Sequence, residues 1–561
     1  MKKLLCLLLC RLMLLACLAG CKKDGEGDQS DSGADSTASV TDEISVADLA
    51  NYSVIYPENA SSEVEKAAKD LANAINEKYS TKITVKNDYY VDMENSRYTI
   101  GEYEILVGET NREESASLVD KLLFKDHGYA LIGKKLAIMG NNDADTVKAV
   151  EAFIAAYVTS AASDAAVFFS ASDNTVTKGD YLHGSIKVGG VDLAEYSIVY
   201  PADGGFEKAL ATKLAYSLAE ACGVFPAIVA DSEAYGNGYE ILIGKTNRSA
   251  DVSALTGAAD GAGYVASSGK FIVLAGNTSW GNATAVNSFI DSYESKEKSD
   301  SLDLTLANAT VAAGAGDLTS MSFNIGGDAD DARMEAIVNI IVNALPDSAG
   351  LQEVSEAALT ALKTALGGYY EFVSVGETAV IFAKDKFVKS SASASDAACA
   401  WAIIERKSDS LKVMQVSVKF DETSATKRQE QSGMLLDLIA ANKSVAVMIS
   451  GDLACATGAS EFKLLISDDM ANASFLAADV VDNGGGDVVD YILAHDYYID
   501  VVSYLRDTSV IWGAEASDRC PITVVYKVNY NGTEVKEETS DSLIIGRDDQ
   551  GDEFGYPSVI Y

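Results

Sequence analysis

Acidic side chains recur at the ends of apolar segments in the C-terminal half of this chain of 561 residues. GLQEV carries Glu353, SGDLA carries Asp452 and VVDYIL carries Asp490, while SFNI brings Asn324 to the end of an earlier segment. The apolar segments are typical of strands separated by helices, so the sequence predicts a layered sheet with one shared cleft for these side chains. Carboxylate oxygens are the ligands that Mg²⁺ prefers, and a bound Mg²⁺ polarises a phosphoryl oxygen. A metal-dependent reaction is therefore the chemistry to test against the rest of the sequence.

The overall composition restricts the partners. The formal net charge is −39, and a surface this acidic repels a phosphate backbone, so nucleic acid is an improbable partner. The same charge is also what solubility alone would produce. The chain has three histidines, His127, His183 and His495, so a mechanism with two active-site histidines must take both from this set. No CxxC pair occurs, which argues against a structural zinc site.

The first 21 residues predict export. A basic start precedes an apolar run that is broken by Arg11 and ends in LAGC at Cys21, as in a secretory signal. LAGC resembles the bacterial lipobox, and this resemblance implies that Cys21 carries acyl chains, which would anchor the protein at the extracellular face of the cell membrane. The alternative is a plain transmembrane anchor, although the run is short for one. Residues 22–45 are rich in Gly, Ser and Asp and predict a flexible linker.

Two copies of one module follow, over residues 46–159 and 190–296. YSVIYP, YEILVGETNR and a GY-initiated hairpin in the first copy return as YSIVYP, YEILIGKTNR and a second GY segment in the same order. Each copy predicts strands mixed with two helices, which indicates a small α+β domain. The module resembles the N-terminal domain of hexosaminidases and α-glucuronidases, which implies a non-catalytic role. Asn111, Arg112, Asn247 and Arg248 raise the possibility of a sugar site, but a structural role at the turn is the preferred interpretation.

The remaining chain, residues 316–530, resembles the endonuclease/exonuclease/phosphatase superfamily. The resemblance implies a four-layer α/β sandwich and a metal-dependent phosphoric ester hydrolase. It places Asn324 and Glu353 at the metal, and Asp452, Asp490 and Asp518 at acidic positions of the catalytic set. Glu353 with Asn324 would hold at most a weak Mg²⁺. Residues 531–561 form an acidic tail without a functional interpretation.

Three positions depart from the family pattern. Where the family has NTHLD this chain has SVKFD, so Lys419 replaces a histidine, and in SDRCP Arg519 replaces another. Ala454 in GDLA replaces the asparagine of the GDxN motif. Arginine cannot exchange a proton near pH 7, and lysine can do so only if its pKa falls by about three units. Loss of acid–base catalysis alone typically costs roughly 10²–10⁴ in rate.

These departures favour a binding or scaffold protein whose phosphoesterase-type domain has lost its catalysis. Lys419 and Arg519 would then either pair with the remaining carboxylates in place of the metal or bind a phosphate or another anion. An active Mg²⁺-dependent enzyme with altered groups and a carbohydrate-associated surface protein are the alternatives. Cys455 and Cys520 adjoin two of the replaced positions, so a disulfide between them is a hypothesis for an exported protein, with free buried thiols the preferred state.

Overall fold

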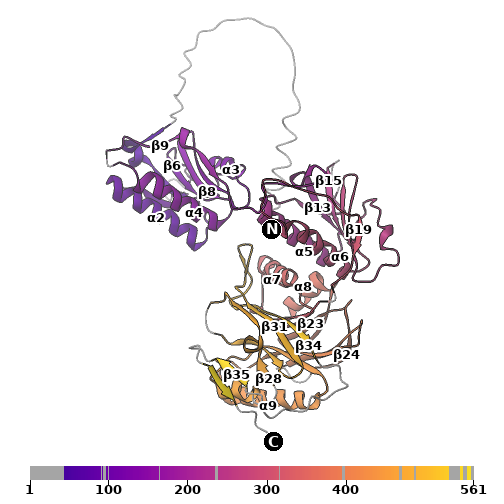
Figure 1. Cartoon of the computed structure of the whole chain (residues 1–561). Helices are drawn as coiled ribbons and strands as arrows, with labels where there is room; N and C mark the ends of the chain where they lie inside the picture. Colours follow the sequence, from indigo (N-terminus) through magenta and orange to yellow (C-terminus); the bar gives the residue numbers. More distant parts are fainter. Residues whose placement is uncertain are drawn as a thin grey trace, which may run out of the picture. The chain divides into compact units, whose positions relative to one another are not determined.

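The structure is a computed structural model that describes residues 43–529 and the segments 544–547 and 553–556 (Figure 1). Within the first range it leaves out 90, 93–96, 99, 163, 234–237, 315, 395–398, 467–469 and 486–487. The chain forms two compact units, one with the described residues up to Leu122 and Asp126–Lys178, the other with Leu123–Lys125 and the described residues from Gly179 onward. None of the described helices combines the length and the apolarity that crossing a membrane requires.

The first unit contains the first copy of the duplicated module. Its six-stranded sheet has the order β10-β7-β8-β6-β2-β3, with β2 (Ser53–Tyr56), β3 (Thr84–Asn87), β6 (Glu104–Val107), β7 (His127–Ile132), β8 (Lys135–Gly140) and β10 (Thr175–Thr177). Helices α2 (Ser62–Tyr79) and α4 (Asp143–Phe153) pack on one face, and α3 (Glu113–Val119) packs on the other. β1 (Glu43–Ser45), the last three residues of the predicted linker, pairs with β9 (Val167–Ser170).

The second copy lies in the second unit and repeats this arrangement. Its sheet has the order β14-β13-β15-β17-β16-β19, with β13 (Tyr196–Tyr200), β14 (Ile228–Ala230), β15 (Tyr239–Ile243), β16 (Gly263–Ser268), β17 (Phe271–Gly276) and β19 (Ala309–Val311). Helices α5 (Gly205–Cys222) and α6 (Ser279–Glu294) correspond to α2 and α4. The expected order of strand, helix, buried strand, hairpin and helix is therefore present in both copies.

The C-terminal part of the second unit is built on two further sheets. The seven-stranded sheet has the order β22-β23-β21-β20-β34-β31-β29, with β20 (Leu318–Asn324), β21 (Ser348–Gln352), β22 (Tyr370–Val375), β23 (Thr378–Ala383), β29 (Asp479–Asp482), β31 (Ile499–Arg506) and β34 (Ile522–Val528). The six-stranded sheet has the order β24-β25-β26-β27-β30-β28, with β24 (Phe387–Ala394), β25 (Cys399–Arg406), β26 (Lys412–Lys419), β27 (Ala446–Asp452), β28 (Met470–Asn472) and β30 (Asp490–His495).

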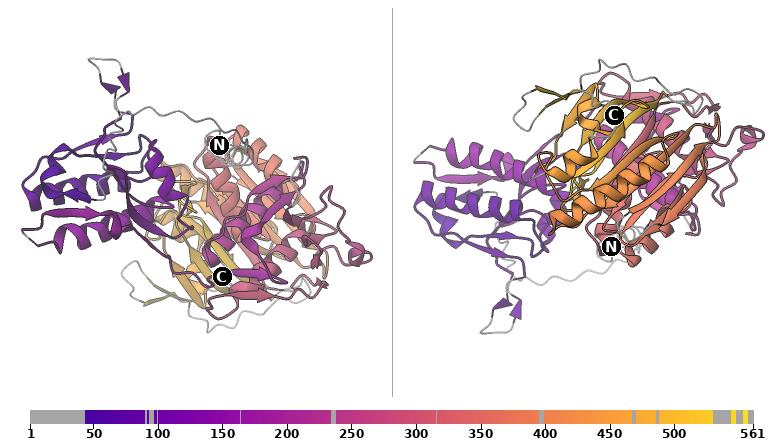
Figure 2. Two further views of the ribbon diagram at one scale, coloured as in Figure 1. Left: turned by 90° about the horizontal axis from the view of Figure 1, so that it is seen from above. Right: turned by 90° about the horizontal axis from the view of Figure 1, so that it is seen from below.

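These two sheets pack face to face through small and polar side chains. A Cβ added at Gly350 of β21 would lie 2.6 Å from the Cβ of Ser450 of β27, so a larger residue there would push the sheets apart. Buried side chains bond across the gap: Gln415 accepts from Ser320 and Ser348 at 2.9 and 2.8 Å. Helices α9 (Ala425–Ala441) and α10 (Ser460–Leu465) cover the outer face of the six-stranded sheet (Figure 2).

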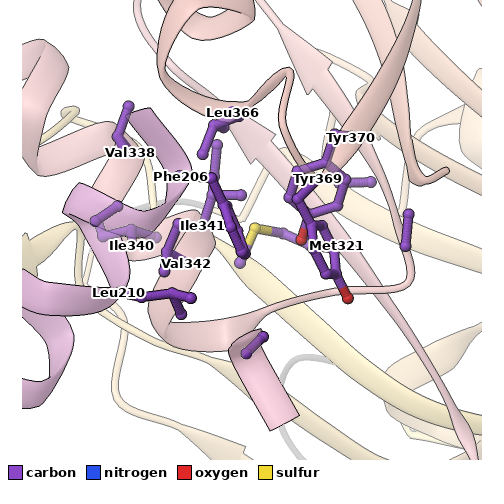
Figure 3. Packing of buried hydrophobic residues seen from close by; sticks show 14 of the residues in the cluster. Phe206, Leu210, Met321, Val338, Ile340, Ile341, Val342, Leu366, Tyr369 and Tyr370 are labelled. Carbon is purple, nitrogen blue, oxygen red and sulfur yellow. The ribbon is translucent and has the colours of Figure 1, made fainter. Parts of the chain in front are cut away.

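On the seven-stranded side, the second copy of the module shares one hydrophobic core with helices α7 (Asp331–Ala344) and α8 (Glu356–Leu366). Phe206 of α5 stacks on Tyr369, with ring centroids 4.6 Å apart, and Leu210 lies beside the same helices (Figure 3). Because both rings are fully buried, this contact removes a large apolar area from water. The second copy and the C-terminal part thus form one packed body.

We expect Phe206→Ala to destabilise the second unit by roughly 3–5 kcal/mol, because it leaves a cavity in this shared core. All three tryptophans of the chain, Trp280, Trp401 and Trp512, belong to this unit, so tryptophan fluorescence during denaturant unfolding reports on it alone. Lys208→Ala, an exposed position of the same helix, should change the free energy of unfolding by less than about 0.5 kcal/mol. Equal effects of the two substitutions would contradict a shared core.

Candidate functional site

Strand register brings three of the expected residues to one level of the six-stranded sheet. Lys419 of β26 lies opposite Asp452 of β27 in the parallel ladder, and Asp452 lies opposite Asp490 of β30 in the antiparallel ladder. Lys419 has the same strand parity as Gln415, whose side chain contacts the other sheet, so it points toward that sheet as well. The alternating pattern of KVMQVSVK therefore determines where this ammonium group lies.

The seven-stranded sheet supplies Asn324 and Glu353 to the same place. Asn324 ends β20 beside Gln352 of β21, and Glu353 follows immediately with φ +54°. This left-handed backbone is uncommon for a residue with a side chain and turns Glu353 toward the gap between the sheets. The Asn324 side-chain amide donates to Glu353 Oε1 at 2.9 Å and to Asp452 Oδ2 at 3.1 Å.

Lys419 lies among three carboxylates that come from both sheets. Its Nζ donates to Glu353 Oε1 at 2.6 Å, to Glu422 Oε1 at 2.7 Å and to Asp452 Oδ2 at 2.9 Å. We call Glu353, Glu422 and Asp452 the carboxylate cluster. Asp452 is fully buried, whereas the side chain of Glu422 is 61% exposed, so the cluster opens to solvent on the Glu422 side.

The charges in this cluster stabilise one another. Burial disfavours the charge on Lys419, but hydrogen bonds with Glu353, Glu422 and Asp452 outweigh burial and hold its pKa above the usual range. Burial would raise the pKa of Glu353, and the hydrogen bonds from Lys419 and Asn324 lower it instead. Lys419 is therefore protonated, and Glu353 is ionised, over the physiological pH range.

Arg519 is held more loosely next to the cluster. Its guanidinium nitrogens lie 3.8 Å from Asp452 Oδ2 and 3.6 Å from Asp490 Oδ2, and its side chain is 28% exposed. Burial followed by the nearby charge of Asp452 raises the pKa of Asp490 to about 7, although Arg519 acts in the opposite direction. Asp490 Oδ1 is buried and makes no hydrogen bond within the described residues. The pentapeptide SDRCP is fixed to β20 by Ser517, which donates to the Asn324 carbonyl at 2.8 Å.

Asp518, Cys455 and Cys520 lie next to the replaced positions. Asp518 is exposed, and its charge acts on the neighbouring Arg519. Cys455 and Cys520 are both free thiols, as in the preferred interpretation, so the structure does not contain the hypothesised disulfide. Burial raises the pKa of the Cys455 thiol to about 11, which makes it unreactive at neutral pH. Cys21, together with residues 1–21 and most of the predicted linker, lies outside the described residues.

The Asn-Arg pairs of the two modules are occupied by internal contacts. Arg112 donates to both carboxylate oxygens of the buried Glu104 at 2.9 and 3.0 Å, and Arg248 does the same to Glu240 at 3.0 and 3.2 Å. The side chain of Asn247 donates to the carbonyl of Asp231 at 2.7 Å. These contacts support the structural interpretation of the pairs and leave no observation in favour of a sugar site there.

The residues of the site do not suit the Mg²⁺ that the sequence resemblance implies. One oxygen from each member of the carboxylate cluster lies within 4.8 Å of the others, which is a spacing that could hold an ion. Mg²⁺ requires an octahedral shell of oxygens at 2.0–2.1 Å and retains several of its waters. The Lys419 ammonium is within hydrogen-bond distance of all three members, so it takes the volume and the negative charge that an ion would need.

Glu422 is the one member of the cluster that sequence reasoning missed. It follows Lys419 by three residues in SVKFDE, shortly after a strand. An acid close in sequence to a lysine at the end of a buried strand is the signal that could have identified it, because a cation in a buried site needs a partner.

Comparisons with known proteins give similar folds over part of the chain. No protein-family model and no curated protein matches this sequence. An endonuclease/exonuclease/phosphatase from Bacteroides vulgatus is 18% identical, with a TM-score of 0.36 over 38% of this chain and 99% of its own. A mannosyl-6-phosphatase from Bacteroides thetaiotaomicron is 17% identical, with a TM-score of 0.34 over 37% of this chain and 99% of its own.

The human Nocturnin catalytic domain with bound sulfate is 15% identical, with a TM-score of 0.33 over 38% of this chain and 95% of its own. These likenesses concern the fold of that part of the chain alone, and the substrates of those proteins are properties of those proteins.

We expect Asp490→Asn to stabilise the protein more at pH 8 than at pH 5. In the folded state the pKa of Asp490 is raised to about 7. The stability that the protonated side chain contributes is therefore fully present below the unfolded-state pKa near 3.8 and is lost as pH rises through 7. An asparagine does not ionise, and the gain at pH 8 should be roughly 1–3 kcal/mol. Denaturant unfolding of the parent protein and the variant at both pH values measures this change in the free energy of unfolding.

Asp500→Asn, which changes an exposed acid on β31, is the matched control and should give the same small effect at both pH values. A gain for Asp490→Asn that does not depend on pH would show that ionisation of Asp490 is not its cause.

We expect Ala454→Gly to stabilise the protein by roughly 0.5–1 kcal/mol. Ala454 has φ +49°, a left-handed conformation that glycine adopts without steric cost and that asparagine tolerates better than alanine. Its N–H donates to Asp452 Oδ1 at 2.9 Å, which holds this turn in place. Ala454→Asn should also be stabilising, by less.

Ala456→Gly is the control for this turn. Ala456 is exposed and is not among the described residues with positive φ, so a glycine there should leave stability unchanged or lower it slightly. Thermal unfolding of the three variants next to the parent protein tests the expected order.

Proposed function

We propose that this chain is a surface lipoprotein whose phosphoesterase-type domain does not catalyse and instead serves as a binding or scaffold module. The observation that carries the proposal is the state of the two cations at the replaced histidine positions. The pKa values of Lys419 and Arg519 are both held above their usual ranges, despite burial, by carboxylates around them. A lysine acts as a base at neutral pH only when its pKa is lowered, and here the direction is the opposite.

Among the described residues of the site, Asp490 is the only other group that could transfer a proton near neutral pH. Ala454 has no side-chain donor or acceptor. His495 lies at the far end of β30, five residues from Asp490, which corresponds to roughly 17 Å along a strand. Asp490 would have to act without a metal and beside Arg519, which lies 3.6 Å away.

A small anion is disfavoured as the ligand of this site. The three N–H donors of Lys419 already bond to the carboxylate cluster, so an anion would have to bind to Arg519. Asp452 and Asp490 flank Arg519 and repel an anion. We therefore favour a protein or glycan partner contacted over a wider surface of the chain.

The place of action in this proposal is the extracellular face of a bacterial cell membrane. This location is inferred from the two lysines and the apolar run at the start of the chain and from LAGC, whose Cys21 would carry the lipid anchor. The two α+β modules, which resemble the N-terminal domains of hexosaminidases and α-glucuronidases, would act as spacers or contribute to binding. Glycan binding by a fragment of residues 43–178, which contains the first compact unit, would favour the carbohydrate-associated alternative instead.

We expect the purified protein with Mg²⁺ or Mn²⁺ to hydrolyse DNA, a phosphodiester and a phosphomonoester no faster than its Glu353→Ala variant. Glu353 is the residue that an active enzyme of this type would need at the metal, so the variant defines the background rate. Turnover clearly above this background and dependent on Glu353 would establish the active, metal-dependent alternative.

A further inference from the structure

Lys419 makes as many hydrogen bonds as an ammonium group can donate. The three N–H bonds of a lysine ammonium point in three directions, and each of them here ends on a different carboxylate. One carboxylate follows a strand of the seven-stranded sheet, one ends a strand of the six-stranded sheet, and the third belongs to the turn after β26. This is the contact pattern of a small central cation with acidic ligands.

Lys419 and Arg519 together carry two positive charges, the same charge as a divalent ion. Lys419 contributes one positive charge in direct contact, and Arg519 contributes a second at 3.8 Å from Asp452. Without them, the fully buried Asp452 would be ionised beside Glu353 with little compensation, which costs several kcal/mol. A cation is therefore required at this position for the acids to remain charged.

We propose that the Lys419 ammonium is a built-in replacement for a divalent cation, and that its removal converts the carboxylate cluster into a divalent-cation site. The ligands of that site would be Glu353, Asp452 and Glu422, with water in the remaining positions. Carboxylate oxygens of this kind select hard ions such as Mg²⁺, Mn²⁺ and Ca²⁺. The inference concerns binding alone and does not depend on the absence of catalysis.

A consequence for the natural protein is that its carboxylate cluster needs no metal ion. The turn that carries Glu422 is held by Lys419 instead, so chelators should leave the stability of the protein unchanged. In Lys419→Ala, by contrast, stability should depend on added divalent cations, because an ion that binds only the folded state stabilises it.

The experiment is a titration of the full chain with MnCl₂. Binding is measured by calorimetry and by the decrease of the free Mn²⁺ signal in electron paramagnetic resonance. We expect Lys419→Ala to bind one Mn²⁺ at least about tenfold more tightly than the parent chain does, with a higher melting temperature in its presence. Lys427→Ala is the matched control, because Lys427 pairs with Asp421 at 3.0 Å in the same segment but contacts no member of the cluster.

A double variant identifies the ligands. Glu422→Gln added to Lys419→Ala removes one carboxylate, so Mn²⁺ affinity should fall at least about tenfold. An affinity unchanged by Glu422→Gln would place the ion elsewhere and overturn the inference.

Lys419→Ala leaves several acids without a partner, so Lys419→Ala combined with Asp490→Asn is measured in parallel. Asp490 lies next to Asp452 in the strand register, and its replacement lowers the local negative charge by one without removing a member of the cluster. The inference is overturned if neither variant binds Mn²⁺ more tightly than the parent, including the case in which both stay unfolded in saturating Mn²⁺. It is also overturned if the parent chain itself binds Mn²⁺ as tightly as Lys419→Ala.

Discussion

The contact between the Lys419 ammonium and its three carboxylates is the interaction on which the site depends. Glu353 comes from the end of one sheet, and Asp452 comes from the end of the other, so this contact joins the two sheets where their strands end. A charge pair that is this buried contributes little net stability compared with an apolar pair, but the loss of one partner is strongly destabilising. Selection on such a site therefore acts on the set of charges as a whole, since no member can change alone without leaving the others uncompensated.

A second constraint acts on the other side of the same domain, where one module of the duplication has become part of a larger core. Helices α2 and α5 are both 18 residues long, and the buried Leu71 and Ile75 of α2 correspond to the buried Leu214 and Leu218 of α5. On the opposite face α2 has exposed charges at Glu63 and Lys66, where α5 has the buried Phe206 and Ala209. The two helices thus differ on one face, which is exposed and charged in α2 and packs into the core shared with α7 and α8 in α5.

The sequence was sufficient for the local structure and for most residues of the site, because both follow from short patterns. β26, β27 and β30 have the expected apolar character, and the GY-initiated segment of the first module forms the expected hairpin of β7 and β8. The packing of α5 on α7 and α8 was not predicted, because the apolar pattern of a helix does not specify which surface covers it. Glu422 was not predicted, because its role follows from the contacts of Lys419, and these contacts depend on how the two sheets pack.

Two turns with left-handed backbone conformations carry residues of the site. Both Glu353 and Ala454 have left-handed backbone conformations, with φ values of +54° and +49°. The side chain of Ala454 does not favour this conformation, and the turn is held by the hydrogen bond that the Ala454 N–H donates to Asp452. At Glu353 the same conformation is needed to bring a carboxylate from one sheet to the lysine of the other. The turn at Ala454 is therefore held by the buried Asp452, and the turn at Glu353 lets a residue of one sheet contact a lysine of the other.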